Sequence, residues 1–310
     1  MENRSAYISI DGYVGVNKYG GLFFSLMISA YLLIVCSNSL IVYLVWSHPN
    51  LHEPMYVFIA ALSVNSVVYS STIYPKLLID FLSEKQVVTH AFCLFQWFTY
   101  YNLGASEVML LAAMAYDRYV SICKPLKYAM IMRRGNVVGI LALVWLFPSG
   151  QMIVPQFLNA RRKLCKFVFQ GIVCNSSVHD LYCTSSAALT TYGLVVFINV
   201  VVLPVVFILY TYGRIFVMAR RSAEMRRKAV KTCLPHLIVL INFTVFIAYD
   251  FLLLRFKSEH TKTVRFAITL QVIMYHPLFN PLIYGLKMDK IHRHIRKLLC
   301  NETTKYTAEI

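Results

Sequence analysis

Charged residues are scarce in this sequence, and acidic residues are scarcer than basic ones. Only 14% of the 310 residues are charged, with 14 Asp and Glu against 30 Lys and Arg, while 58% are apolar. The mean hydropathy is +0.59. A soluble globular domain is a poor match for this composition, which favours a membrane protein.

Long apolar runs are correspondingly abundant. A helix needs about 20 apolar residues to cross the hydrocarbon core of a bilayer. Seven runs reach roughly this length, at residues 21–46, 55–74, 91–116, 136–158, 184–213, 232–254 and 266–286. They are continuous rather than alternating, which favours helices over a β-barrel. The sequence therefore predicts an all-α membrane protein, a bundle of seven transmembrane helices.

The basic residues predict how such a bundle is oriented. If the N-terminus is outside the cell, the inner loops and the tail hold more Lys and Arg than the outer loops, as the positive-inside rule requires. The net charge of +16 then reflects topology and anionic lipid rather than nucleic-acid binding. We expect a multi-pass plasma-membrane protein with one domain over 1–310: an extracellular N-terminus (1–20), the bundle (21–286) and a cytoplasmic tail (287–310).

The first twenty residues lack the features of a cleavable signal peptide, so we expect the first apolar run to direct insertion. In the tail, apolar Ile291, Ile295, Leu298 and Leu299 alternate with basic residues. This pattern predicts a short amphipathic helix on the membrane lipid.

Cysteines lack the close pair spacing of a structural zinc site, and we expect neither a metal nor a cofactor. Four of the eight cysteines fall in the expected outer segments, where disulfides persist: Cys93, Cys165, Cys174 and Cys183. Sequence alone allows three pairings of these four. Two sequons, at Asn3 and Asn175, lie outside and are candidates for glycosylation.

An acid and a base stand together at the inner end of the third run, in the stretch MAYDRYVSICKPLKY. At a membrane boundary, Asp117 and Arg118 can pair, or the arginine can swing away to water. The pair is thus a candidate two-state element, although an interfacial anchor would carry the same residues.

Further motifs accompany this pair in order along the chain. They are Asn38, Leu51-His52-Glu53-Pro54-Met55-Tyr56, Met114-Ala115-Tyr116-Asp117-Arg118-Tyr119, Lys228-Ala229 with Thr232-Cys233 and His236, and Asn280-Pro281-Leu282-Ile283-Tyr284. With them the chain resembles the rhodopsin-like G-protein-coupled receptors, and within these the odorant receptors, over nearly its whole length. Flanking sequence around residues 83–86 and 275–281 is most similar to odorant receptors of fish.

The resemblance implies a receptor rather than an enzyme. Its partners would be a small-molecule odorant outside and a heterotrimeric stimulatory G protein inside, raising cyclic AMP. Coupling and activation would involve Asp117, Arg118, Tyr119, Asn280, Pro281 and Tyr284. The resemblance also implies two disulfides, Cys93 with Cys174 and Cys165 with Cys183.

One position departs from the wider superfamily. Ser66 stands where the second helix usually carries an acid, which puts a sodium site in doubt. Glu107 matches the odorant-receptor acid of the third helix and is the main charged candidate in the bundle core. An intramembrane carboxyl is a functional hypothesis, and a neutral core acid is the plainer alternative.

Ligand recognition is expected in the outer half of the bundle. Trp97, Tyr100, Tyr101 and Gly104 recur at three- and four-residue spacing and so share a helix face. On the sixth run Tyr249, Asp250 and Arg255 are further candidates: Arg255 suits a carboxylate and Asp250 an ammonium group. About 140° separates these last two around a helix, so we expect one of them to face the ligand, with Arg255 preferred.

Other functions fit the sequence less well. Tyr100 replaces the aspartate of amine receptors, and no lysine in the seventh run could form the Schiff base of an opsin. Protease motifs and the paired halves of a transporter are missing. A receptor for a non-odorant metabolite, or a ligand-gated seven-helix channel of opposite topology, remain as alternatives.

Overall fold

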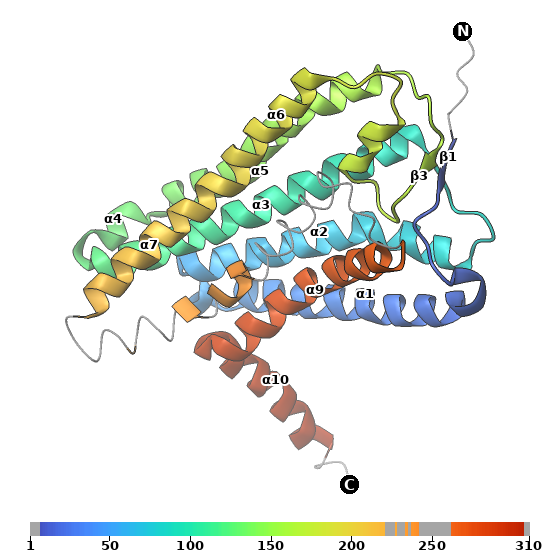
Figure 1. The fold of residues 1–310 in the computed structure, drawn as a ribbon. Helices are drawn as coiled ribbons and strands as arrows, with labels where there is room; N and C mark the ends of the chain where they lie inside the picture. Colours follow the sequence, from blue (N-terminus) through green and yellow to red (C-terminus); the bar gives the residue numbers. More distant parts are fainter. Residues whose placement is uncertain (1–6, 221–226, 228–232, 235–236, 242–261, 307–310) are drawn as a thin grey trace.

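The computed structural model describes residues 7–220, 227, 233–234, 237–241 and 262–306. Within this part of the chain, long helices lie alongside one another as a bundle (Figure 1). They are α1 (Val16–Ser47), α2 (Pro54–Leu82), α3 (His90–Cys123), α5 (Arg134–Ala160), α6 (Ala187–Phe197), α7 (Leu203–Ala219), α9 (Lys262–Lys287) and α10 (Asp289–Tyr306). Short helical turns connect some of them: η1 (Pro49–Leu51), η2 (Pro125–Lys127), α4 (Tyr128–Ile131) and η3 (Ser176–Leu181).

Among the described residues, five helical segments are long and apolar enough to cross a membrane. They are Val16–Ser47, Pro54–Leu82, Arg134–Ala160, Ala187–Ala219 and Lys262–Leu286. These segments cover the first, second, fourth, fifth and seventh predicted runs. The helices extend beyond the apolar runs, most of all α2, which continues through Pro75 to Leu82.

The third and sixth predicted runs are not among these five candidate membrane-spanning segments. The third is an unbroken helix of 34 residues, α3, whose start is capped by the Thr89 hydroxyl accepting from the Phe92 N–H. Its polar and tyrosine side chains make it less apolar than the five, and Glu107 lies at its middle. The sixth run falls largely outside the described residues. The count of seven spans therefore stays a prediction.

The fifth run is a continuous helical rod with a distortion at its centre. Between α6 and α7 the segment η4 (Ile198–Val202) is π-helical, and the Leu203 N–H donates to the Ile198 carbonyl five residues back. Pro204 follows directly and has no N–H to continue the α-helical ladder. The proline thus explains why the helix widens at this point.

Three short strands form a sheet that the sequence did not reveal. β1 (Tyr7–Ile10) pairs antiparallel with β2 (Val87–Thr89) and parallel with β3 (Val168–Phe169), in the order β2-β1-β3. Figure 1 shows β1 and β3 at one end of the bundle, beside the N-terminal side of α3. Ile8 and Phe169 point inward and are buried. We call this end, which also carries both disulfides, the disulfide end.

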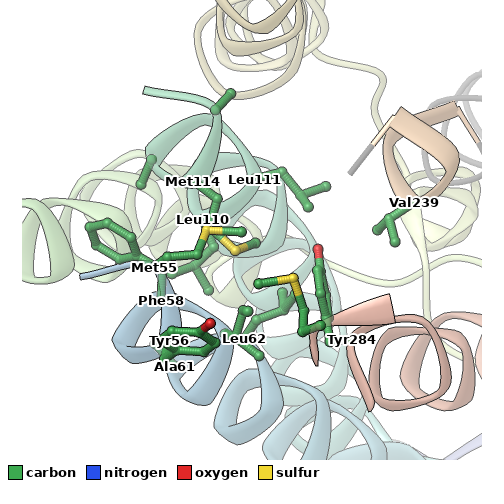
Figure 2. Close-up of a cluster of buried hydrophobic side chains, with 14 of the residues drawn as sticks. Met55, Tyr56, Phe58, Ala61, Leu62, Leu110, Leu111, Met114, Val239 and Tyr284 are labelled. Atoms are coloured by element: carbon green, nitrogen blue, oxygen red, sulfur yellow. The ribbon is translucent and has the colours of Figure 1, made fainter. Parts of the chain in front are cut away.

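Apolar side chains fill the bundle in two clusters. One includes Leu62, Leu110, Leu111 and Tyr284, which gather between α2, α3 and α9 in Figure 2. The other, which includes Tyr74, lies toward the disulfide end. Because lipid tails are as apolar as these side chains, close packing rather than exclusion of water holds such helices together.

Helix α10 follows α9 directly, and that it lies on the membrane surface stays a prediction. Ile291 is fully buried, and Ile295 packs against the first cluster. On another side Lys290 forms an ion pair of 2.5 Å with Glu53, and Arg293 is exposed. The helix is therefore fastened to the start of α2 by both an apolar contact and a charge pair.

Candidate functional site

A cavity of about 390 Å³ opens within the bundle toward the disulfide end. All four residues that the spacing on the third run singled out contribute to its wall: Trp97, Tyr100, Tyr101 and Gly104. A cavity of this size, lined mainly by apolar and aromatic groups, is typical of a small-molecule site. The helical periodicity of α3 is what brings these four to one face.

The aromatic residues of the wall hold one another in place. The ring centroids of Trp97 and Tyr101 are 5.5 Å apart, and those of Tyr100 and Tyr101 are 5.1 Å apart and nearly perpendicular. Tyr69 of α2 adds a further ring 5.7 Å from Tyr100. These ring contacts, of which the one between Tyr100 and Tyr101 is edge-to-face, give the cavity an aromatic side.

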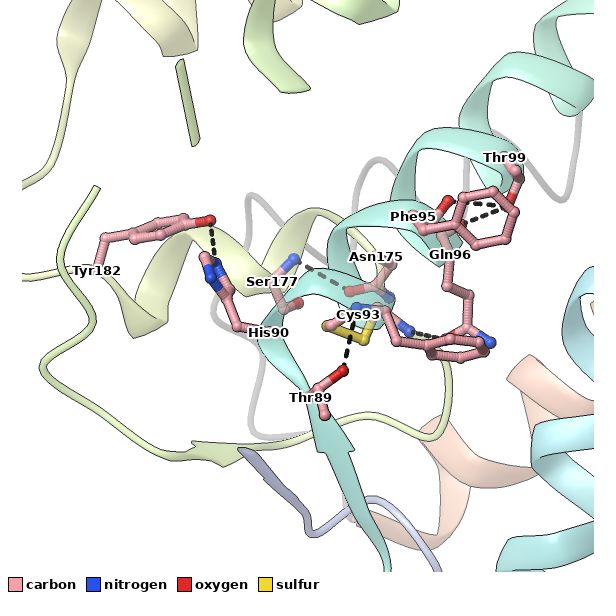
Figure 3. Close-up of a disulfide and its surroundings, with 11 residues drawn as sticks. Thr89, His90, Cys93, Phe95, Gln96, Thr99, Asn175, Ser177 and Tyr182 are labelled. Carbon is pink, nitrogen blue, oxygen red and sulfur yellow. Dashed lines mark hydrogen bonds between the residues drawn. A yellow bond between two sulfur atoms is a disulfide. The ribbon is translucent and has the colours of Figure 1, made fainter. Parts of the chain in front are cut away.

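The loop between α5 and α6 covers the cavity. The disulfide between Cys93 and Cys174 ties this loop to the start of α3, and the Cys174 N–H donates to Gln96 Oε1 at 3.0 Å (Figure 3). Beyond it, the Ser176 N–H donates to the Tyr101 hydroxyl, also at 3.0 Å. The loop is thereby fixed to α3 at three points.

The second disulfide, between Cys165 and Cys183, closes a smaller ring within the same loop. Both disulfides are the pairs that the resemblance implies. Figure 3 shows a further tie, in which His90 and the Tyr182 hydroxyl are hydrogen-bonded at 3.1 Å. We call this loop, residues 161–186 between α5 and α6, the lid.

Four lid residues that sequence reasoning missed also line the cavity, namely Ser176, Ser177, His179 and Asp180. They belong to η3, which begins where Asn175 accepts a hydrogen bond from the Ser177 N–H. Burial, helped by the nearby Arg162 charge, lowers the pKa of His179 from its ordinary value. In the sequence, the one indication that these four residues line the cavity is their position two to six residues after Cys174.

A buried polar group forms the floor of the cavity. The Asn280 amide donates to Glu107 Oε1 at 2.9 Å and to the Ser66 hydroxyl at 3.5 Å. His276 Nδ1 lies 3.9 Å from the same carboxyl oxygen. Glu107 and His276 both line the cavity, whereas Asn280 is fully inside the bundle. The floor thus joins the cavity to the Asn280-Pro281 motif.

The proline of that motif also makes a hydrogen bond between helices possible. Pro281 has no N–H, so the Pro277 carbonyl four residues back loses its usual donor. The Asn38 side chain of α1 supplies one instead, with Nδ2 at 2.9 Å from that carbonyl. Asn38 is itself fully buried. This bond explains why an asparagine in the first run accompanies Asn-Pro in the seventh.

At the opposite end of α3, Asp117 and Arg118 form the expected ion pair, with 3.5 Å between Oδ2 and Nη2. The pair differs from a water-exposed one, because Asp117 is only 1% exposed. The Tyr128 hydroxyl, which sequence reasoning missed, donates to Asp117 Oδ1 at 2.8 Å. Tyr119 lies next to the pair, with Lys124 Nζ 5.5 Å from its ring centroid.

Some candidates lie outside the described residues: Tyr249, Asp250, Arg255 and Asn3. The other glycosylation candidate, Asn175, is half-buried at the start of η3.

Within the described part of the chain, no group of three or more His, Cys, Asp or Glu side chains is placed to hold a metal ion. Among the described lining residues of the cavity, none is a lysine or an arginine.

Comparisons with known proteins agree with this architecture. The sequence profile of the olfactory receptor family matches residues 24–302. Olfactory receptor 11A1 of Homo sapiens is 33% identical over 309 residues, covering 95% of this chain and 94% of that protein. Olfactory receptor 226 of Rattus norvegicus is 35% identical, covering 90% and 87%, and olfactory receptor 1J21 of Mus musculus is 32% identical, covering 90% of each.

The apolar helices are those of a multi-pass membrane protein, and the relatives that match it are G-protein-coupled receptors. With a profile match over most of its length, the chain belongs to the olfactory receptor family. It is a receptor for odorants and not an enzyme.

Proposed function

We propose that the cavity at the disulfide end binds a small-molecule odorant and that binding activates a stimulatory G protein at the opposite end, raising cyclic AMP. The observation that carries this proposal is the Glu107–Asn280 hydrogen bond. It places a residue of the cavity in contact with the α9 motif that continues to Tyr284, while α3 itself runs on to Arg118.

In this proposal the disulfide end is extracellular, the N-terminus lies outside and the tail after α9 is cytoplasmic. The two disulfides support it, because such bonds persist in an oxidising compartment. The basic residues of α10 support it as well, since they would face anionic lipid on the inner leaflet. The bundle and its short termini then form a single receptor domain.

Activation would act on the ion pair between Asp117 and Arg118. In the described conformation Asp117 holds Arg118 on one side and accepts from Tyr128 on another. Release of this pair would free the guanidinium to contact the G protein. The residues of the coupling site would be Asp117, Arg118, Tyr119, Asn280, Pro281 and Tyr284.

The cavity can be tested through Gly104. A Cβ atom added at this glycine would meet no other heavy atom within 4 Å, so a side chain there would extend into open cavity space. Gly139 of α5 has equally open surroundings but faces outward, which makes it a matched control. The first carbon of a new side chain meets open space at both positions, so the two substitutions differ mainly in whether they face the cavity.

The experiment uses cells that express the chain together with the olfactory stimulatory G protein. Panels of carboxylic acids, amino acids and amines are applied, and cyclic AMP and surface expression are measured. We expect an agonist from these panels to lose its effect on Gly104→Leu and keep it on Gly139→Leu. An agonist whose response is the same on both variants would place its binding site elsewhere.

A further inference from the structure

A second cavity, of about 430 Å³, lies on the outer side of the seam between α5 and α6. Its wall is mostly apolar and includes Val154 and Leu158 of α5 and Ala188 and Leu189 of α6, with Arg162 at its rim. We call it the lipid-facing groove.

The position of the groove indicates what surrounds it. Val154 and Leu158 are 42% and 46% exposed, and their neighbour Phe157 is 56% exposed. Both helices belong to membrane-spanning segments, so apolar side chains exposed there contact lipid tails. Arg162 marks the headgroup level, where its guanidinium donates to Asn159 and to the Thr184 carbonyl.

The groove and the odorant cavity share part of their walls. Leu189 and Tyr192 line both of them, and Pro155 of α5 lines the cavity side of the same seam. Leu189 and Tyr192 therefore lie between the lipid-facing groove and the space proposed for the ligand.

One hydrogen bond fastens the seam at this point. Pro155 has no N–H, so the Gln151 carbonyl four residues back has lost its α-helical donor. The Tyr192 hydroxyl of α6 donates to that carbonyl at 3.0 Å. Asn199 adds a longer contact of 3.5 Å to the Gln151 side chain. The Tyr192 bond is between a side chain and a backbone carbonyl, so it can break without disrupting either helix.

We propose that the lipid-facing groove binds uncharged apolar molecules dissolved in the bilayer and that Tyr192 is the gate through which they pass into the odorant cavity. This rests on the cavity being the ligand site. The groove explains how a ligand that partitions into lipid reaches a cavity covered by a disulfide-bonded lid. Its apolar wall admits a hydrocarbon chain, and the space between α5 and α6 widens when the Tyr192 bond opens.

The test follows a probe rather than signalling. The purified receptor is placed in phosphatidylcholine nanodiscs, and its tryptophan fluorescence is quenched by 1-bromooctane, which partitions into the bilayer. Trp97 lines the odorant cavity, so the part of the quenching that disappears in Trp97→Phe reports arrival of the probe there. Acrylamide, which stays in water, measures access from the aqueous side.

Two variants change the route in opposite directions. Tyr192→Phe removes one hydrogen bond, and we expect the rate of Trp97 quenching by 1-bromooctane to rise about fivefold. Ala188→Phe fills the groove, so we expect this quenching to be slowed or lost while acrylamide quenching is unchanged. Val206→Phe, at an exposed lipid-facing position of α7, is the matched control and leaves both rates as they are.

Equal bromooctane quenching in Ala188→Phe and Val206→Phe would overturn the proposal, and this arm does not depend on Tyr192→Phe folding. The readout is also independent of the G protein. If Ala188→Phe slows the quenching but no odorant evokes a response, the route through the groove is supported and the proposed function is contradicted. If Gly104→Leu abolishes an odorant response but Ala188→Phe leaves the quenching unchanged, the proposed function is supported and the route is contradicted.

Discussion

Asn280 of α9 donates a hydrogen bond of 2.9 Å to Glu107 of α3 in the interior of the bundle. Asn280 is 2% exposed and Glu107 is 7% exposed. The bond joins a residue of the cavity wall to the Asn-Pro motif. Under the proposed function, a ligand that moves Glu107 would act on α9 through this bond.

Two substitutions of Glu107 distinguish its role as a hydrogen-bond acceptor from the role of its carboxyl group. Glu107→Leu leaves the Asn280 amide without this partner, which costs about 1–3 kcal/mol for a buried donor. Glu107→Gln keeps a carbonyl oxygen in the same place, so we expect a smaller loss. Thermal unfolding of the purified receptor in detergent measures both. A Gln variant as unstable as the Leu variant would show that the bond to Asn280 is not what stabilises this site.

Tyr128 is expected to hold the receptor in its inactive conformation. Its hydroxyl donates to buried Asp117, and a hydrogen bond to a charged acceptor contributes about 1.5–3 kcal/mol. Tyr128→Phe removes this bond and loosens the partner of Arg118, so basal cyclic AMP should rise several-fold at equal surface expression.

Tyr210→Phe is the control for this substitution, because Tyr210 is exposed on the lipid side of α7. It removes the same hydroxyl group without touching the ion pair. Basal signalling that is unchanged in Tyr128→Phe, or equally raised in Tyr210→Phe, would contradict the role given to Tyr128.

The two disulfides should differ in their contribution to stability. They close loops with sequence separations of 81 and 18 residues. On the chain-entropy account the larger loop contributes about 4.5 kcal/mol and the smaller about 3 kcal/mol. We therefore expect Cys93→Ser with Cys174→Ser to reduce surface expression more than Cys165→Ser with Cys183→Ser. The opposite order would mean that the lid depends mainly on its internal ring.

The lid should lose stability in acid because of His179. Burial and the Arg162 charge lower the pKa of His179 in the folded receptor, whereas an unfolded histidine titrates near about 6.5. As the pH falls, the unfolded chain takes up the proton first. The contribution to stability is therefore complete above about pH 6.5 and declines below it, toward the lowered pKa of the folded state.

This decline is measured as the change in unfolding temperature between about pH 7.5 and about pH 5.5. We expect His179→Gln to reduce the change, and His292→Gln, at an exposed histidine of α10, to leave it as in the wild type. An identical pH dependence in all three proteins would exclude His179 as its source.

Sequence patterns predicted the parts of this structure that depend on local periodicity. Three- and four-residue spacing placed Trp97, Tyr100, Tyr101 and Gly104 on one helix face, and all four line the cavity. Apolar length located the spans that the described helices occupy. The pairing of the cysteines, by contrast, came from resemblance, because spacing alone left three possibilities.

What the sequence did not indicate depends on contacts between distant segments. β1 joins strands near residues 88 and 168, and each strand is too short to carry a recognisable alternation. The Tyr128 bond to Asp117 and the Tyr192 bond to Gln151 link different helices, so no helical period relates their residues. For the second of these bonds Pro155 gave a local signal, since a proline in the interior of a helix leaves the carbonyl four residues back without its usual donor.

The most direct test of the account is cyclic AMP evoked by an agonist in cells that contain the olfactory stimulatory G protein, comparing the wild type with Arg118→Ala. The account predicts a response in the wild type that is lost in Arg118→Ala with surface expression unchanged. A response that persists in Arg118→Ala, or an agonist-evoked current in the absence of any G protein, would contradict it.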